Sequence, residues 1–133
     1  LRVRGEWDGG NPFGAGCTDL PGESVAVLTR ATIDWRRLRR FWRAVPPVSE
    51  TLGRQPGNLA SFGIGEWPLI QMATFSLWEN VQAMQQYAYR SAAHRHAIHR
   101  TQEVGWFREE MYARFRPFRS EGSWEGQVFA PGQ

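Results

Sequence analysis

Apolar residues along the chain follow two kinds of repeat, one with the alternation of β-strands and one with the spacing of α-helices. Strands are predicted at residues 24–32, 58–66, 68–78 and 111–120. Helices are predicted at residues 35–45 and 81–104. The resulting order, β-α-β-β-α-β, is typical of a ferredoxin-like α+β fold, in which one antiparallel sheet carries both helices on the same face.

The ends of the first predicted helix follow from residues with strong preferences there. Asp34 can cap the helix, and Trp35 and Trp42 recur on one apolar stripe. Pro46 and Pro47 predict the end of the helix, because proline lacks the N–H that a helix interior requires.

The strand predicted at residues 68–78 is apolar or small on both of its faces. One face carries Ile70, Met72 and Thr74, and the other carries Ala73, Phe75 and Leu77. A sheet with helices on one side normally exposes a polar second face to water. We therefore expect a second sheet to cover the open face, either from another copy of the chain in a dimeric α+β barrel or from an upstream unit.

Two segments of the chain resemble each other. RVRGEWDGG, near the start, and RSEGSWEG, near the end, share an Arg, a Gly, a Trp, an acid and a final Gly at the same spacing. This similarity predicts that residues 1–23 are the tail of a preceding unit and a linker, followed by one ferredoxin-like domain at residues 24–133. Residues 1–13 should then pack against a sheet edge or a neighbouring chain, in a place equivalent to residues 119–129.

The composition narrows the class of protein. The 133 residues suit one domain, and seven Trp with eight Phe favour a large apolar cavity or an extensive interface. All 16 basic residues are Arg, but the net charge is only +3, so no nucleic-acid partner is expected. The lone Cys17 excludes an intrachain disulfide and suits a reducing cytoplasm. No apolar run is long enough to cross a membrane.

The three histidines, His94, His96 and His99, lie close together in the second predicted helix. On a helix, His94 shares the apolar stripe with Ile98, whereas the other two histidines point to solvent. A zinc site prefers two ligands four residues apart, and Ile98 occupies that position, so zinc is not expected. His94 is then either a hydrogen-bonded core residue or a single axial ligand to haem iron.

Two arginines interrupt apolar strands. Arg30 shares strand parity with Ala26 and Leu28, and Arg114 lies between Ala113 and Phe115. A buried arginine needs an anionic partner. That partner is either an internal acid, such as Glu66 or Glu110, or a bound carboxylate such as a haem propionate.

The helix predicted at residues 35–45 is rich in arginine. Arg36, Arg37, Arg40 and Arg43 flank or oppose its aromatic stripe. This pattern indicates a surface helix that packs on the sheet, or a face that adheres peripherally to an anionic membrane.

Several motifs together indicate a family. LTRATI, FGIGEWPL, AYRSAAHRHAI and GWFREEMYARF occur in this order, within residues 24–126. They resemble the C-terminal part of the spheroidene monooxygenase family, the bacterial carotenoid 2-oxygenases, or ketolases, of acyclic carotenoid synthesis. The missing first half of such a protein matches the upstream unit inferred from the repeated segment.

The resemblance implies a haem-dependent monooxygenase that uses dioxygen and an electron donor to introduce a keto group into an apolar polyene such as spheroidene. Carried onto this chain, it implies His94 as the iron ligand and Arg30 and Arg114 as propionate anchors. Phe75, Trp106 and Phe107 are expected to wall the cavity. Two other functions are compatible with the residues: a non-catalytic module that dimerises and binds an apolar ligand, and a cofactor-free monooxygenase.

Overall fold

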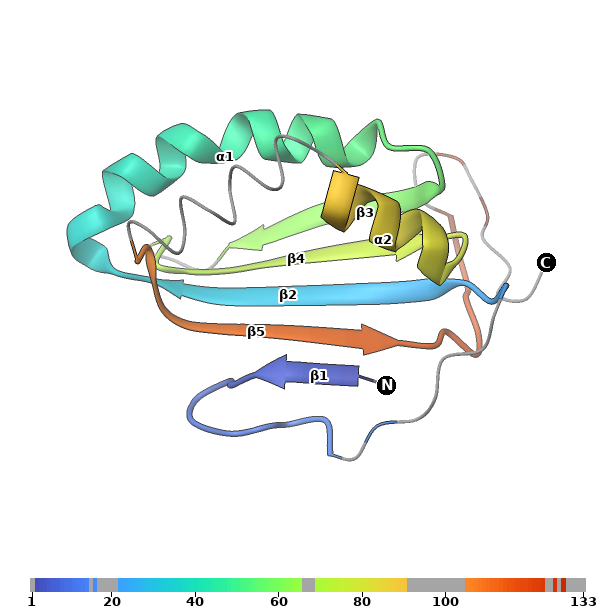
Figure 1. The fold of residues 1–133 in the computed structure, drawn as a ribbon, viewed down its shortest axis with the longest axis horizontal. Helices are drawn as coiled ribbons and strands as arrows, with labels where there is room; N and C mark the ends of the chain where they lie inside the picture. Colours follow the sequence, from blue (N-terminus) through green and yellow to red (C-terminus); the bar gives the residue numbers. More distant parts are fainter. Residues whose placement is uncertain are drawn as a thin grey trace.

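The computed structural model describes residues 2–14, 16, 22–65, 69–90, 105–123, 126 and 128. Its strands are β1 (Arg2–Gly5), β2 (Val25–Ile33), β3 (Asn58–Gly65), β4 (Gln71–Trp78) and β5 (Phe107–Phe115). Its helices are the short 3₁₀ segment η1 (Trp35–Arg37), α1 (Leu38–Gly53) and α2 (Val81–Arg90). The strands form an antiparallel sheet in the order β1-β5-β2-β4-β3, with α1 and α2 on the same face (Figure 1). The predicted ferredoxin-like fold is confirmed, with β1 added at one edge.

The helix-facing side of the sheet is buried in two separate apolar clusters. Cluster 1 contains Val25, Val27, Trp78, Met84 and Tyr87, and joins β2 and β4 to α2. Cluster 2 contains Ile33, Phe41 and Trp106, and joins the far end of β2 to α1. Residues of β2 reach both clusters from the same face because side chains two apart in a strand point to the same side.

The first helical region begins at Trp35 as predicted, as the η1 segment, and continues in α1 to a later end than predicted. The Asp34 carboxylate accepts a hydrogen bond from Arg36 N at 3.0 Å, so it caps the preceding η1 segment. The prediction that Pro46 and Pro47 end the helix is wrong, because α1 continues through both of them to Gly53. The fixed φ angle of proline is compatible with a helix. The apolar contact of Leu52 with cluster 1 stabilises the longer helix and offsets the backbone hydrogen bonds that the two prolines cannot donate.

Strand β5 begins and ends earlier than predicted. It covers Phe107–Phe115, and an irregular register between Thr32 and Ile33 lets Phe107 pair with Ile33. Glu109 and Glu110 therefore lie inside the strand, before the start predicted from the sequence. The strand ends before Pro117, which cannot donate to a sheet ladder. The predicted continuation of the second helix over residues 92–104 lies outside the described residues.

Strand β1 pairs with β5 at the edge of the sheet, with Arg2 opposite Arg114 and Gly5 opposite Met111. Gly5 has a φ of +87°, and a Cβ atom there would collide with the backbone of Glu110. The predicted packing of the N-terminal segment against a sheet edge is thus confirmed for residues 2–5. Its equivalence to residues 119–129 stays a prediction, since part of that range lies outside the described residues.

Gly57→Ala is expected to destabilise the fold by about 1–3 kcal/mol. Gly57 has a φ of +77°, and an added Cβ would approach the Ala83 Cβ atom to 2.5 Å. The matched control is Gly53→Ala at the exposed end of α1, where the nearest atom is Ser61 Oγ at 3.9 Å. The midpoint of urea unfolding should be lower for Gly57→Ala than for the unsubstituted protein and should not fall for Gly53→Ala. Equal midpoints for the two variants would contradict the prediction.

Candidate functional site

Four residues on neighbouring strands form a row across the helix-facing side of the sheet. Gly63 of β3 pairs with Thr74 of β4, Thr74 pairs with Thr29 of β2, and Thr29 pairs with Tyr112 of β5. Paired residues of a sheet point to the same face. These four residues are called the central row.

Among the described residues, no atom fills the space directly above Gly63, and the Thr29 side chain of the central row is exposed. Thr29 lies in an interior strand on the face that carries the helices, yet its side chain is exposed, whereas Val27 and Ala31 on either side are buried. A Cβ atom built on Gly63 would meet no atom within 4 Å. Because cluster 1 and cluster 2 lie at opposite ends of β2, the opening falls between two apolar groups. We refer to it as the central space.

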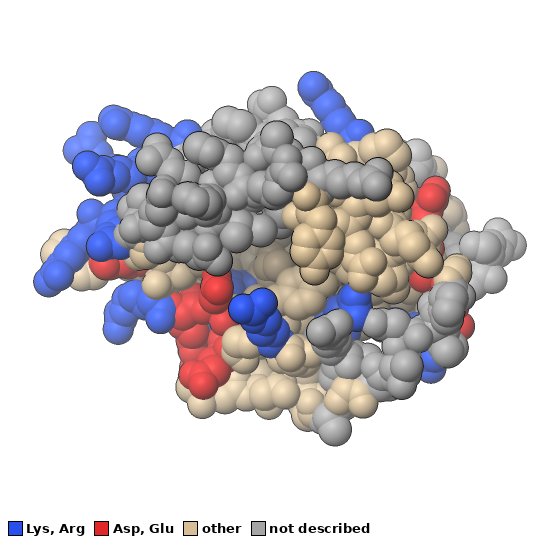
Figure 2. Space-filling model, in the orientation of Figure 1, with Lys and Arg blue, Asp and Glu red and all other residues tan. Residues whose placement is uncertain are grey.

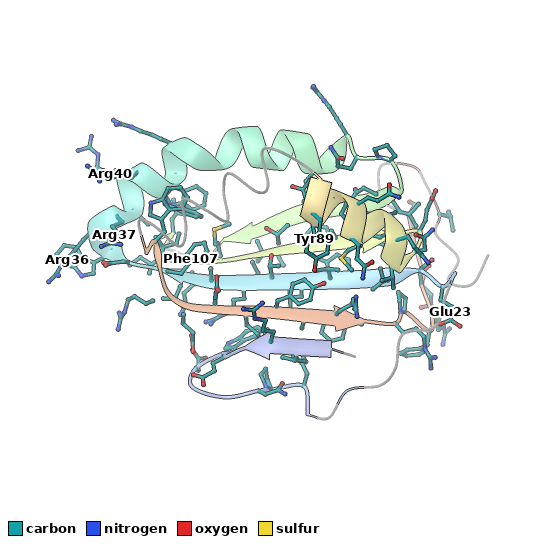
Figure 3. All side chains as sticks on the ribbon, viewed as in Figure 1. Glu23, Arg36, Arg37, Arg40, Tyr89 and Phe107 are labelled. Carbon is teal, nitrogen blue, oxygen red and sulfur yellow. The ribbon has the colours of Figure 1, made fainter. Side chains whose placement is uncertain are left out.

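Aromatic and polar atoms lie at both ends of the central space. At the cluster 1 end, the Tyr112 hydroxyl donates to Met84 Sδ at 3.5 Å, and burial raises the pKa of Tyr87. At the cluster 2 end, Phe41 packs edge-on against Trp106 at 5.8 Å and against Phe107 at 5.6 Å. Figure 3 labels Phe107 at the start of β5. The indole Nε1 of Trp106 is buried and donates to no atom of the described chain. A buried donor of this kind suits a polar atom of a bound molecule.

The two arginines predicted as a common clamp lie on opposite faces of the sheet. Arg114 pairs with Val27, which belongs to the helix-facing cluster 1, and its side chain is only 4% exposed. Arg30 alternates with Thr29 and Ala31, so it points to the open face, where it is 7% exposed. The structure therefore does not bring Arg30 and Arg114 together at one site.

Arg30 is held by the N-terminal segment and by β5. Its guanidinium lies 3.2 Å from Glu109 Oε2 and 3.5 Å from Asp8 Oδ1, and 4.5 Å from the centre of the Trp7 ring. The alternative of an internal ion pair is observed, with Glu109 and Asp8 in place of the predicted Glu66 or Glu110. The sequence signal for Asp8 as a partner of Arg30 is the Trp-acid-Gly motif at residues 7–9.

Contacts with the N-terminal segment and with Arg30 lower the pKa of the Glu109 carboxyl group. The amide of Gly9 donates to Glu109 Oε1 at 3.0 Å, and this hydrogen bond is the main cause that lowers the pKa of Glu109. Burial opposes this effect, and the Asp8 amide and the Arg30 guanidinium lower the pKa of Glu109 further. The carboxylate of Glu109 thus links residues 8–9 to Arg30.

The open face is apolar, as predicted, and the N-terminal segment covers the half formed by β5 and β2. Phe13 packs edge-on against Phe115 at 5.0 Å. On the other half, Phe75 stacks on Phe62 at 5.2 Å, and Ile64 of β3 is exposed. Phe75 therefore lies on the face opposite the central space, and the structure does not place it with Trp106 and Phe107.

Some predicted features fall outside what the structure can locate. His94, together with the other two histidines, lies outside the described residues. Among the residues that are described, no three His, Cys, Asp or Glu side chains gather as a metal site. No helix in that part of the chain is both long and apolar enough to cross a membrane.

Two solved structures share the fold of this chain. A protein from Nitrosomonas europaea assigned as an antibiotic biosynthesis monooxygenase matches with a TM-score of 0.62 and 13% identity, over 77% of this chain and 98% of that one. Rv0793 from Mycobacterium tuberculosis matches with a TM-score of 0.63 and 11% identity, over 74% and 99% of the two chains. The chain thus has the ferredoxin-like fold of the antibiotic biosynthesis monooxygenases.

The sequence gives the family. The chain is 43% identical over 129 residues to spheroidene monooxygenase of Rhodobacter capsulatus, a match that covers 96% of this chain and 54% of the relative. It is 40% identical to the enzyme of the same name from Rubrivivax gelatinosus, over 96% of this chain and 48% of the relative. The chain belongs to the spheroidene monooxygenase family, and it spans about half the length of the curated relatives it matches. No family model matches the sequence.

Proposed function

We propose that this chain is part of a monooxygenase that oxidises a long apolar polyene, an acyclic carotenoid such as spheroidene. The observation that carries the proposal is the central space between two apolar clusters. Thr29 is exposed there although its strand is interior, and no described atom lies within 4 Å of a Cβ built on Gly63. The names of the sequence relatives supply the substrate class.

The chemistry of the central space suits one end of a polyene. Apolar side chains of cluster 1 and cluster 2 bound it, and the central row contributes only hydroxyl groups and a glycine. The Thr29 hydroxyl is directed at the Thr74 carbonyl at 3.5 Å, so the two threonines contribute no charge to the row. A binding site of this type orients an apolar chain by shape and excludes water from the reacting carbon.

The proposal includes haem as the group that activates dioxygen, with electrons from an external donor. Trp106 fits such a group, because its buried indole N–H donates to no atom of the described protein. Arg114, buried on the helix-facing side, stays the proposed propionate anchor. Arg30 does not fit, since it lies on the other face and two carboxylates already neutralise it. His94 remains the proposed iron ligand, and Phe107 a proposed wall residue.

A second sheet is proposed to pack on the half of the open face formed by β4 and β3. Phe75 stacks on Phe62 there, and Ile64 of β3 is exposed on the same face. Another copy of the chain or the remaining part of a longer protein can supply this sheet, as in a dimeric α+β barrel.

Titration of the purified chain with haem b should give a Soret band that saturates at one haem per chain. His94→Ala is expected to abolish the band, and Arg114→Gln to weaken haem binding about tenfold, the effect of one lost charge-assisted hydrogen bond. His96→Ala is the matched control and should keep the band, because this histidine is predicted to face solvent. Circular dichroism checks that each variant is folded.

A chain that binds a carotenoid but gives no Soret band would overturn the haem part of the proposal. Consumption of dioxygen by such an iron-free preparation would then indicate a cofactor-free monooxygenase. Binding without any consumption would indicate a non-catalytic module.

A further inference from the structure

One end of the molecule combines exposed apolar side chains with arginines. Trp35 is 65% exposed and Leu69 is 43% exposed, although large apolar side chains are usually buried. Arg36, Arg39, Arg40 and Arg43, also exposed, surround the start of α1. These six residues are called the basic end, and Figure 2 shows the blue side chains gathered there.

Main-chain and side-chain hydrogen bonds hold the two parts of the basic end together. Ile33 N donates to Ile70 O at 2.7 Å, which joins the end of β2 to the segment before β4. The Trp42 indole donates to Leu69 O at 3.2 Å, which joins α1 to the same segment. Trp35 and Leu69 therefore project from a fixed framework at one end of the sheet.

The backbone at Leu69 supports a specific role for its exposure. Leu69 has a φ of +69°, a left-handed conformation that costs a residue with a Cβ atom about 1 kcal/mol or more. The hydrogen bond from the Trp42 indole to the Leu69 carbonyl stabilises this backbone conformation. The Leu69 side chain itself is 43% exposed, so its burial contributes little. A strained, exposed leucine is unfavourable for folding alone, so a binding role would explain it.

No described acidic side chain forms an ion pair with the arginines of the basic end. Arg39 and Arg43 lie on the side of α1 opposite the buried Phe41, and Arg40 flanks it. Within the described part of the chain, the four arginines of the basic end form no ion pair, and Arg36 lies over the Trp35 ring at 5.4 Å. Asp34 is already engaged as the cap of η1.

We propose that the basic end docks the protein on the surface of an anionic lipid bilayer. Trp35 and Leu69 would enter the interface, where an indole ring is favoured, and the arginines would contact lipid phosphates. The inference rests on these exposed groups alone and does not require haem, a polyene or oxygenase activity.

The shape of the charged region favours a bilayer over a nucleic acid. A nucleic acid follows a continuous basic groove, whereas here a group of acidic side chains lies directly beside the arginines (Figure 2). The first half of β5 carries two acids, Glu109 and Glu110, and Glu110 is exposed. A flat membrane would contact only the tip of the molecule and leave these acids in water.

The test is flotation of the chain with vesicles of phosphatidylcholine alone or with about one-third phosphatidylglycerol. Binding is expected only to the anionic vesicles and should fall in high salt, because ionic screening weakens it. Arg39→Gln with Arg40→Gln should lower the partition coefficient roughly 10- to 30-fold, from about 1 kcal/mol for each arginine near the surface. Trp35→Ser with Leu69→Ser should also lower it.

Two control substitutions lie away from the basic end. Arg54→Gln removes an exposed arginine at the opposite end of α1, and Tyr89→Ser removes an exposed aromatic from α2 (Figure 3). Both should leave vesicle binding unchanged. Equal binding to neutral vesicles, equal loss in the controls, or preferential binding of single-stranded RNA over anionic vesicles would each overturn the proposal.

Discussion

Replacing Gly63 by leucine is expected to lower the affinity for a carotenoid about tenfold or more while the fold stays intact. A side chain at this position would project from β3 into the central space, where a Cβ atom meets nothing within 4 Å. The added volume would therefore displace ligand without displacing protein. Quenching of tryptophan fluorescence by the bound polyene measures the affinity.

Two further variants make the Gly63 experiment decisive. Gly63→Ala should have a smaller effect than leucine, because it fills less of the space. Gly53→Leu places the same side chain at an exposed site on α1 and should leave binding unchanged. Normal carotenoid binding by folded Gly63→Leu would show that the ligand does not enter above the central row.

Arg30→Met is expected to lower the midpoint of urea unfolding, because it leaves the Glu109 and Asp8 carboxylates without their cation. The variant also loses the contact with the Trp7 ring, so the N-terminal segment should become more accessible to protease. The control is Arg119→Met, which breaks a solvent-exposed pair with Glu121 and should cost less than 1 kcal/mol, or about nothing. Urea unfolding and limited proteolysis measure the two effects.

The same contact should respond to acid. The pKa of Glu109 is lower in the folded protein than its ordinary value of 4.5, so ionisation of this group favours the folded state above that pH. The contribution should be lost as the pH falls from 4.5 through the lowered pKa. Glu109→Gln should remove this part of the pH dependence, and an unchanged acid profile would contradict the assignment.

Much of the fold could be predicted from the sequence because strand parity and helical stripes report directly on burial. The apolar residues on both faces of β4 correctly predicted an apolar open face. The end of α1 could not be predicted, because Pro46 and Pro47 are strong local signals that the distant contact of Leu52 with cluster 1 outweighs. The start of β5 depended likewise on an irregular pairing with β2.

The candidate site was harder to predict than the fold. Arg30 and Arg114 each interrupt an apolar strand, but only the register between β2 and β5 shows that they face opposite sides. The central row was missed because threonine and glycine carry no pattern that suggests a site. Its signal is spatial, since an exposed threonine is unusual only once its strand is known to be interior.

The pairing of β1 with β5 has a consequence for the order in which the chain folds. Gly9 and Glu109, which bond across this region, are 100 positions apart, so their contact closes a very long loop. During synthesis, residues 2–13 leave the ribosome well before residues 107–115 exist. The rings of Trp7 and Phe13 are therefore exposed to water until β5 has been synthesised. Until then, chaperones and proteases can bind the N-terminal segment of the nascent chain.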